Sequence, residues 1–187
     1  MQILHLKSVC RRKKYNYIKS TPDITAENVL NREFYADAPD EKWLTDVTEF
    51  KYYVGAEVRK VYLSAILDIF DRRIVSYKIG TSNNNQLVFE TFDEAVADNP
   101  TAHPLFHSDR GFQYTSKTFH NMLMKAGMRQ SMSRVGRCID NGPMEGFSSK
   151  EEITTAIKEY IEFYNTKRYQ LKLKCMTPME YHSVAAA

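Results

Sequence analysis

The sequence contains little cysteine and no long apolar run. Its three cysteines, Cys10, Cys138 and Cys175, are an odd number without paired spacing. This excludes a disulfide framework and is typical of free thiols in a reducing compartment. No apolar stretch approaches the roughly 20 residues that cross a bilayer, and the first residues lack the basic-then-apolar order of a secretory signal. We therefore expect a cytoplasmic protein without a membrane partner.

The composition is that of a globular domain with a basic N-terminal arm. The chain has 187 residues, of which 43% are hydrophobic and 26% charged, so one domain is the default. Residues 1–20 carry six Lys or Arg and no acid, whereas acids outnumber bases in the rest of the chain. This asymmetry indicates a polyanion partner, and the alternative is a solvated tail that binds nothing. The candidate DNA contacts in the arm are Arg11, Arg12, Lys13 and Lys14.

Strand patterns begin beyond an expected linker over residues 20–41. One or two helical turns are expected within this linker, at 25–30. After it, residues 42–50 alternate between two faces, and the runs 58–70 and 74–79 are rich in β-forming residues. The connections between these runs are short, so they predict antiparallel hairpins.

Helices and short strands alternate in the second half of the chain. The helical segments are 83–98 and 116–127, and the short strands that follow them are 105–107 and 128–132. Ser149 and Glu152 form a capping box at the start of a last amphipathic helix, and its apolar stripe is expected to include Tyr160 and Tyr164. Together these elements predict an α/β fold, with a five-stranded mixed sheet and helices on both faces.

Two acids occupy positions where a strand pattern makes an acid unusual. Asp46 lies in the middle of the first strand, although strands are depleted in Asp and an unpaired buried charge is costly. Asp109 follows the apolar run 104–106 closely, so we expect it at the tip of a buried strand, where open α/β sheets bind ligands. Taken alone, Asp46 could be a surface residue and Asp109 a turn residue.

Glu145 is the third candidate acid. Asp140 or Asn141 can cap a helix that has Pro143 in its first turn, and Glu145 would project from that turn. The bland interpretation is an acid that complements the helix dipole. Three acids that converge repel one another unless cations lie between them, and Mg²⁺ is held in proteins by a few carboxylates. Two such ions about 3.5–4 Å apart suit phosphoryl transfer on a nucleic acid.

Four segments of the chain form an ordered set of motifs. They are Thr45-Asp46-Val47-Thr48-Glu49-Phe50, Tyr62-Leu63-Ser64-Ala65-Ile66-Leu67-Asp68, His107-Ser108-Asp109-Arg110-Gly111-Phe112-Gln113-Tyr114 and Asp140-Asn141-Gly142-Pro143-Met144-Glu145-Gly146-Phe147. Thirty-five residues separate Asp109 from Glu145. This set resembles the catalytic core of a DDE transposase, of the bacterial insertion-sequence branch related to retroviral integrases. Segments 160–165 and 176–181 also resemble that family.

The resemblance implies a ribonuclease H-like fold and a polynucleotidyl transferase. It implies that Asp46, Asp109 and Glu145 are catalytic and hold two Mg²⁺ or Mn²⁺ ions. The implied reaction is phosphodiester cleavage at transposon ends followed by strand transfer. The implied partners are transposon-end and target DNA and further copies of the chain in a synaptic complex, in the bacterial cytoplasm and at the nucleoid when DNA is bound. Further candidate DNA contacts are Arg110, Arg134 and Arg137, for which a solvated loop is the alternative.

Two departures from the family pattern leave an alternative function open. The family normally has a helix-turn-helix region ahead of the core, and residues 1–20 resemble only its tail. After Glu145 the family continues along a longer helix with a basic residue two turns on, whereas this position holds Glu152 and the next helix begins sooner. A shortening here could displace Glu145 and spare the fold. The alternatives to a transferase are therefore an inactive DNA-binding or oligomerising remnant and, third, a simple Mg²⁺-dependent nuclease.

The chain is expected to divide into three parts. Residues 1–41 would be the basic arm and linker, a remnant of the helix-turn-helix region. Residues 42–147 would be the integrase-like catalytic core, and residues 148–187 its C-terminal helix and basic tail.

Overall fold

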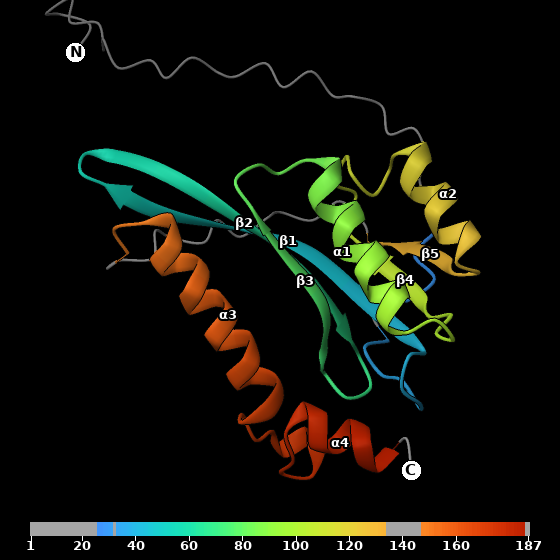
Figure 1. The fold of residues 1–187 in the computed structure, drawn as a ribbon. Coiled ribbons are helices and arrows are strands. Elements are labelled where there is room, and N and C mark those ends of the chain that lie inside the picture. Colours follow the sequence, from blue (N-terminus) through green and yellow to red (C-terminus); the bar gives the residue numbers. More distant parts are fainter. Residues whose placement is uncertain (1–25, 32, 134–146, 186–187) are drawn as a thin grey trace, which may run out of the picture.

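One five-stranded sheet organises the molecule. The computed structural model describes residues 26–31, 33–133 and 147–185. Within them the strand order is β3-β2-β1-β4-β5 (Figure 1). The strands are β1 (Lys42–Val54), β2 (Glu57–Asp68), β3 (Ile74–Gly80), β4 (Leu105–Ser108) and β5 (Arg129–Met132).

The pairing of these strands is mixed. β1, β2 and β3 are joined by short turns and pair antiparallel, whereas β4 pairs parallel with both β1 and β5. Gly55 forms the β1–β2 turn with a φ of +61°, which glycine adopts without a steric penalty. The antiparallel hairpins and the mixed sheet expected from the sequence are confirmed.

Helices begin where the sequence provides capping side chains. The Asn84, Ser116 and Ser149 side chains each accept a hydrogen bond from the backbone N–H three residues on. None of the described helices has both the length and the apolar character to cross a lipid bilayer. The helices are α1 (Asn85–Asp98), α2 (Lys117–Lys125), α3 (Lys150–Thr166) and α4 (Pro178–Ala185), with a 3₁₀ turn at Leu171–Leu173.

Apolar cores lie on both faces of the sheet. On one face, Trp43 and Phe106 are fully buried under α1 and α2 (Figure 1). On the other face, α3 buries Ile153, Ile157 and Ile161 against the distal parts of the antiparallel strands. The expectation of helices on both faces is therefore confirmed, and burial of these side chains is the main stabilising term.

The β1–β2 hairpin extends well beyond the rest of the sheet. β1 and β2 have 13 and 12 residues, whereas β4 has only 4 and pairs with β1 only at Lys42, Trp43 and Leu44. The distal half of the hairpin is therefore a two-stranded ribbon, which reaches past the sheet in Figure 1. This ribbon comprises residues 50–61, because β2 still pairs with β3 from Tyr62 to Leu67.

Two expectations from the sequence are wrong. The described residues of the 25–30 segment are not helical, because they run beside β5, where Leu30 N–H bonds Ser131 Oγ at 3.1 Å. Tyr160 is 55% exposed and is not part of the buried stripe of α3. Its hydroxyl instead accepts a hydrogen bond from Arg168 at 3.1 Å. In the 25–30 segment, tertiary contacts override the local helix propensity. In α3, Tyr160 lies on the flank of the helix and not on its buried stripe.

Candidate active site

Asp46 and Asp109 lie at the same edge of two neighbouring parallel strands. Leu44 on β1 is in register with His107 on β4, and each acid lies two residues beyond that pair. Asp109 follows the last residue of β4, as the sequence predicts for a strand-tip acid. Both side chains are exposed. The parallel register therefore brings together two acids that are distant in the sequence.

The two carboxylates influence each other electrostatically. The pKa of Asp46 is raised above its ordinary value. The main cause is partial loss of hydration, because neighbouring protein atoms surround the carboxylate. A hydrogen bond from the backbone N–H of Val47 opposes this rise, and the negative charge of Asp109 adds to it. A cation between the two groups would relieve both unfavourable effects, so the donor set fits a divalent ion.

A tight turn fixes the carboxylate of Asp109. Its Oδ1 accepts the backbone N–H of Gly111 at 2.8 Å. The Gly111 carbonyl in turn accepts the N–H of Tyr114 at 3.0 Å, and the Tyr114 carbonyl accepts Nε2 of Gln130 on β5 at 2.8 Å. Asp109 is therefore both a turn residue and a site residue, and its second oxygen makes no hydrogen bond to the described residues.

A buried hydroxyl pair supports the two acids, and the sequence analysis missed it. The Tyr114 hydroxyl lies 3.1 Å from Oγ1 of Thr45, which is next to Asp46 in β1. Burial raises the pKa of Tyr114, the Thr45 hydroxyl opposes the rise, and the charges of both acids add to it. Thr45 and Tyr114 each lie in one of the matched motifs. A polar residue within an apolar pattern was the signal that could have indicated this pair.

His107 is a structural residue next to the site. Its Nδ1 lies 2.9 Å from Oγ of Ser131 on β5, and that oxygen also accepts the N–H of Leu30. The Ser131 hydroxyl therefore bonds both His107 and the segment before β1. Burial lowers the pKa of His107, so the neutral ring ties β4 to β5 and to the preceding segment.

Of the other expected site residues, the structure describes only Arg110. Arg110 is exposed and its Nε donates to the Ser133 carbonyl at 3.0 Å. In the part of the chain that the structure describes, no group of three or more candidate metal ligands is present. Glu145, Arg134 and Arg137 and the arm residues Arg11, Arg12, Lys13 and Lys14 lie outside the described residues.

Known insertion-sequence transposases resemble this chain along almost its whole length. The putative transposase InsK of insertion sequence IS150 from Escherichia coli is 39% identical over 198 residues, covering 98% of this chain and 69% of the relative. An uncharacterized transposase-like protein from Haemophilus influenzae is 38% identical over 197 residues, covering 98% of this chain and 89% of that protein. The two alignments, of 198 and 197 residues, are longer than the chain of 187 residues. Each relative therefore has residues that align with none in this chain.

Solved integrase structures share the fold. The catalytic core domain of HTLV-2 integrase, in a dimeric form in complex with magnesium, aligns with a TM-score of 0.55 at 15% identity and covers 78% of this chain and 97% of that one. The cryoEM structure of the simian T-cell lymphotropic virus intasome with PP2A regulatory subunit B56 gamma aligns with a TM-score of 0.57 at 17% identity, covering 79% and 56%. The ribonuclease H-like fold is confirmed.

Two family models, both described as integrase core domain, match residues 36–138 and 142–184. Together with the relatives, these matches identify a transposase or integrase catalytic core, and they do not favour the inactive remnant. The chain belongs to the integrase core domain family, among the insertion-sequence transposases.

Proposed function

We propose that this chain performs metal-dependent phosphodiester cleavage and strand transfer at transposon ends, as a polynucleotidyl transferase. The observation that supports this most is the meeting of Asp46 and Asp109 at one edge of the parallel strand pair. Two exposed carboxylates in mutual repulsion are the donor set that hard divalent cations prefer. The transposases among its relatives support the reaction class.

In this proposal Asp46, Asp109 and Glu145 hold two Mg²⁺ or Mn²⁺ ions. When bound, the ions would supply charge for the attacking hydroxyl and for the leaving oxygen. Asp109 would contribute its carboxylate, which the Gly111 N–H orients through Oδ1. Asp46 contributes an ionised carboxylate only above its raised pKa, so protons and metal compete for it.

The wider DNA-binding surface is also part of the proposal. Arg110 stands next to Asp109 and is exposed, so it can contact a phosphate near the acids. We assign the same role to the arm, to Arg134 and to Arg137. The proposed division remains 1–41, 42–147 and 148–187, with several copies of the chain in the synaptic complex.

A strand-transfer assay with the full chain tests this proposal. The substrate is a labelled duplex carrying an end of the element in which the gene lies, with Mn²⁺ and a plasmid target. We expect joined product from the wild type, and a loss of at least about 100-fold for Asp46→Asn and Asp109→Asn, as for removal of a key electrostatic group. Asp93→Asn, an exposed acid on α1, is the matched control and should join normally.

The other outcomes identify the alternatives. Cutting without joining indicates the simple nuclease. No cutting at all, with DNA binding unchanged by Asp109→Asn, indicates the remnant.

A further inference from the structure

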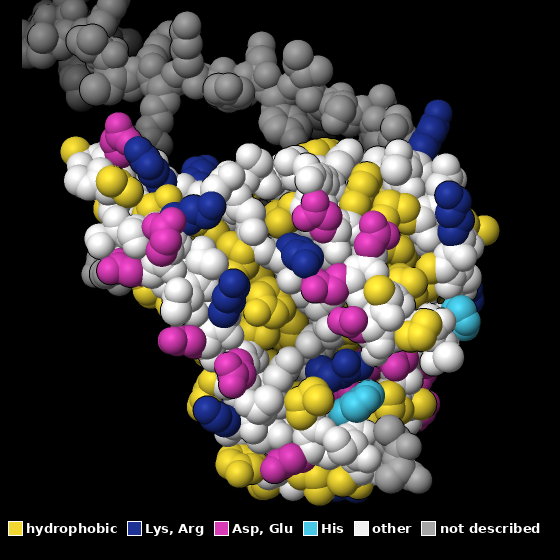
Figure 2. Space-filling model, in the orientation of Figure 1, with side chains coloured by type: hydrophobic (Ala, Val, Ile, Leu, Met, Phe, Trp, Pro, Cys, Tyr) yellow, Lys and Arg dark blue, Asp and Glu magenta, His cyan; other side chains and the backbone are white. Residues whose placement is uncertain are grey.

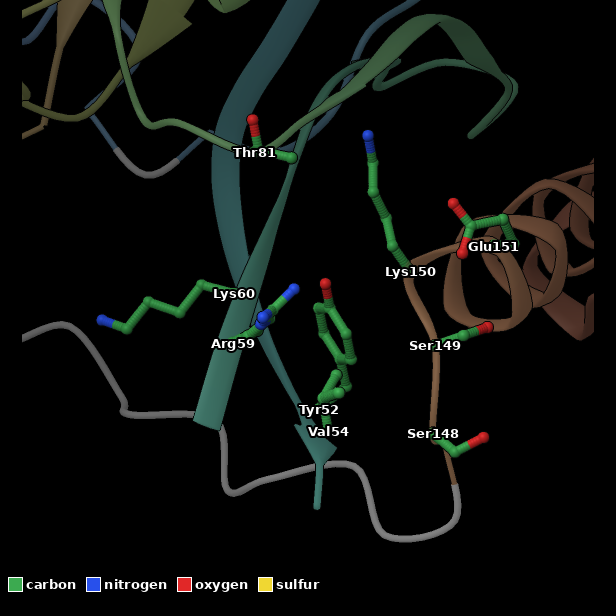
Figure 3. A pocket seen from close by; sticks show the side chains of 9 residues that line it. All are labelled: Tyr52, Val54, Arg59, Lys60, Thr81, Ser148, Ser149, Lys150 and Glu151. Atoms are coloured by element: carbon green, nitrogen blue, oxygen red, sulfur yellow. The ribbon is translucent and has the colours of Figure 1, made fainter. Parts of the chain in front are cut away.

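A cavity of about 490 Å³ lies at the distal end of the β1–β2 ribbon, where α3 begins. Its walls come from both ribbon strands, from Thr81 after β3 and from Ser148 to Glu151 (Figure 3). Figure 2 shows Lys and Arg side chains gathered, with a few acids, over the end of the molecule where the ribbon and the start of α3 lie. The cavity is open to solvent, and its lining is mixed polar and apolar.

Two cationic side chains line opposite walls of this cavity. Arg59 is in register with Tyr52, so both point to the α3 side of the ribbon, and Lys150 extends along the opposite wall (Figure 3). Lys60 follows Arg59 in β2, so its side chain points to the other side of the strand (Figure 3). There its Nζ donates to a carboxylate oxygen of Glu49 at 2.9 Å. The cationic character of the cavity therefore rests on Arg59 and Lys150.

Both cations are available to a ligand. Arg59 pairs with Glu57 at 3.1 Å, but both side chains are more than half exposed, and such pairs contribute about 0–1 kcal/mol. Lys150 has no ion-pair partner within the described segments. The adjacent Glu151 lowers the net positive charge of the cavity without cancelling it.

The start of α3 does not itself provide the anion site. Ser149 Oγ already accepts the N–H of Glu152 at 3.1 Å, and the Glu152 carboxylate accepts both the N–H and the hydroxyl of Ser148. This box satisfies the first turn internally. Attraction for an anion must therefore come from the two side chains.

The cavity is aligned with the acid pair. Asp46 and Tyr52 point to the same face of β1 because their positions differ by an even number. Six strand residues span about 20 Å, which equals about six nucleotides of one DNA strand at roughly 3.4 Å each. We propose that the cavity binds a backbone phosphate of a DNA strand that runs from the acid pair along the ribbon. This inference rests on the proposed function, since it takes DNA as the ligand.

Binding of the full chain to a fluorescent 25-base-pair duplex, in EDTA and over a range of salt concentrations, tests the inference without catalysis. Lys150→Ala and Arg59→Ala should each weaken binding, and the double variant should lower the salt slope by about 0.9, the value for one neutralised phosphate. Lys125→Ala, at the end of α2 far from the ribbon in Figure 1, should leave the slope unchanged. A double variant that binds with the wild-type slope would overturn the proposal.

Acetylation footprinting provides a readout at the residue itself. Lys150 should be protected when the duplex is bound, and Lys125 should not. Orthophosphate alone, at matched ionic strength, should not protect Lys150, and if it does, the cavity is a small-anion site and the DNA path is wrong. Protection of Lys150 in a chain that fails to join DNA would contradict the proposed function and leave this site standing.

Discussion

The Tyr114 hydroxyl donates a hydrogen bond to Oγ1 of Thr45 across a fully buried contact of 3.1 Å. The direction follows from the partners, because Thr45 uses its own hydrogen to bond the Ala65 carbonyl at 3.0 Å. A chain of three groups thus connects the turn after β4, strand β1 and strand β2. It lies directly behind the residues that carry the two acids.

Tyr114→Phe should destabilise the fold by about 1 kcal/mol, the usual net value of a buried neutral hydrogen bond. The ring keeps its packing against Phe119, so no cavity forms. Urea unfolding measures the change, and Tyr169→Phe, at a 69% exposed position, should be neutral. Equal midpoints for Tyr114→Phe and the wild type would show that the bond contributes nothing.

Asp46→Asn should stabilise the metal-free protein at pH 7. The pKa of Asp46 is raised above 3.8, so the folded chain binds this proton more tightly than the unfolded chain does. Stability is therefore greatest while the group is protonated, and it falls as pH rises through the raised pKa. The gain of the Asn variant should be present at pH 7 and absent at pH 3 in urea unfolding.

The same variant should lose the response to metal. Free Mn²⁺ at about 100 times its Kd stabilises a folded chain by about 2.7 kcal/mol, and Asp46→Asn should show little of this effect. Asp93→Asn should respond to Mn²⁺ as the wild type does. A full Mn²⁺ response in Asp46→Asn would place the metal elsewhere.

The sequence was sufficient for the sheet, because alternation and capping are local signals. Trp43 alternates inward in β1 and is fully buried, and Ser116 caps α2 as its position predicts. The segment around Leu30 was not predictable in this way, because its backbone bonds to Ser131, 101 residues away. The prediction that Tyr160 is buried was wrong for a related reason, since periodicity does not specify which flank of a helix the sheet covers.

The candidate site was predictable where a single residue is unusual in its local sequence pattern. Asp46 and Asp109 are conspicuous as acids in apolar strands, and the parallel register brings them together. The Tyr114–Thr45 contact joins residues 69 apart, so their pairing leaves no local signal in the sequence. Glu145 was a candidate from its place near a helix cap, but its catalytic role is implied by the resemblance and remains a prediction.

Asp68→Asn should change the pH dependence of stability. Asp68 is fully buried and its pKa is raised to about 6, mainly by burial and further by the charge of Asp71. The folded chain therefore holds this proton longer, and the wild type loses stability as pH rises from 3.8 towards 6. The variant lacks this titration, so its free energy of unfolding should gain on the wild type across that window.

The slope is the test for Asp68, because the absolute stability also changes. The carboxylate accepts N–H groups from Asp40 and Phe70 at 2.7 and 2.8 Å. An amide can satisfy only one of them, at a cost of about 1–3 kcal/mol. Urea unfolding at pH 4, 5, 6 and 7 separates this constant offset from the titration, and parallel curves would refute the raised pKa.

Gly111→Ala should impair metal binding more than folding. A Cβ at residue 111 would lie 2.9 Å from Oδ1 of Asp109 and 3.0 Å from Oε1 of Gln113. Both atoms are ends of flexible side chains, so the fold can yield with a small loss of stability, but the Asp109 carboxylate must move. Displaced ligands bind metal weakly, since such sites tolerate about 0.5 Å of error. Titration of the Mn²⁺ response should show at least a tenfold rise in Kd, with a urea midpoint close to that of the wild type.

Gly55→Asn, at the remote ribbon turn with a φ of +61° and no atom near its Cβ, should leave the Mn²⁺ affinity unchanged. A Gly111→Ala protein that binds Mn²⁺ normally would show that Asp109 does not contribute to the metal site.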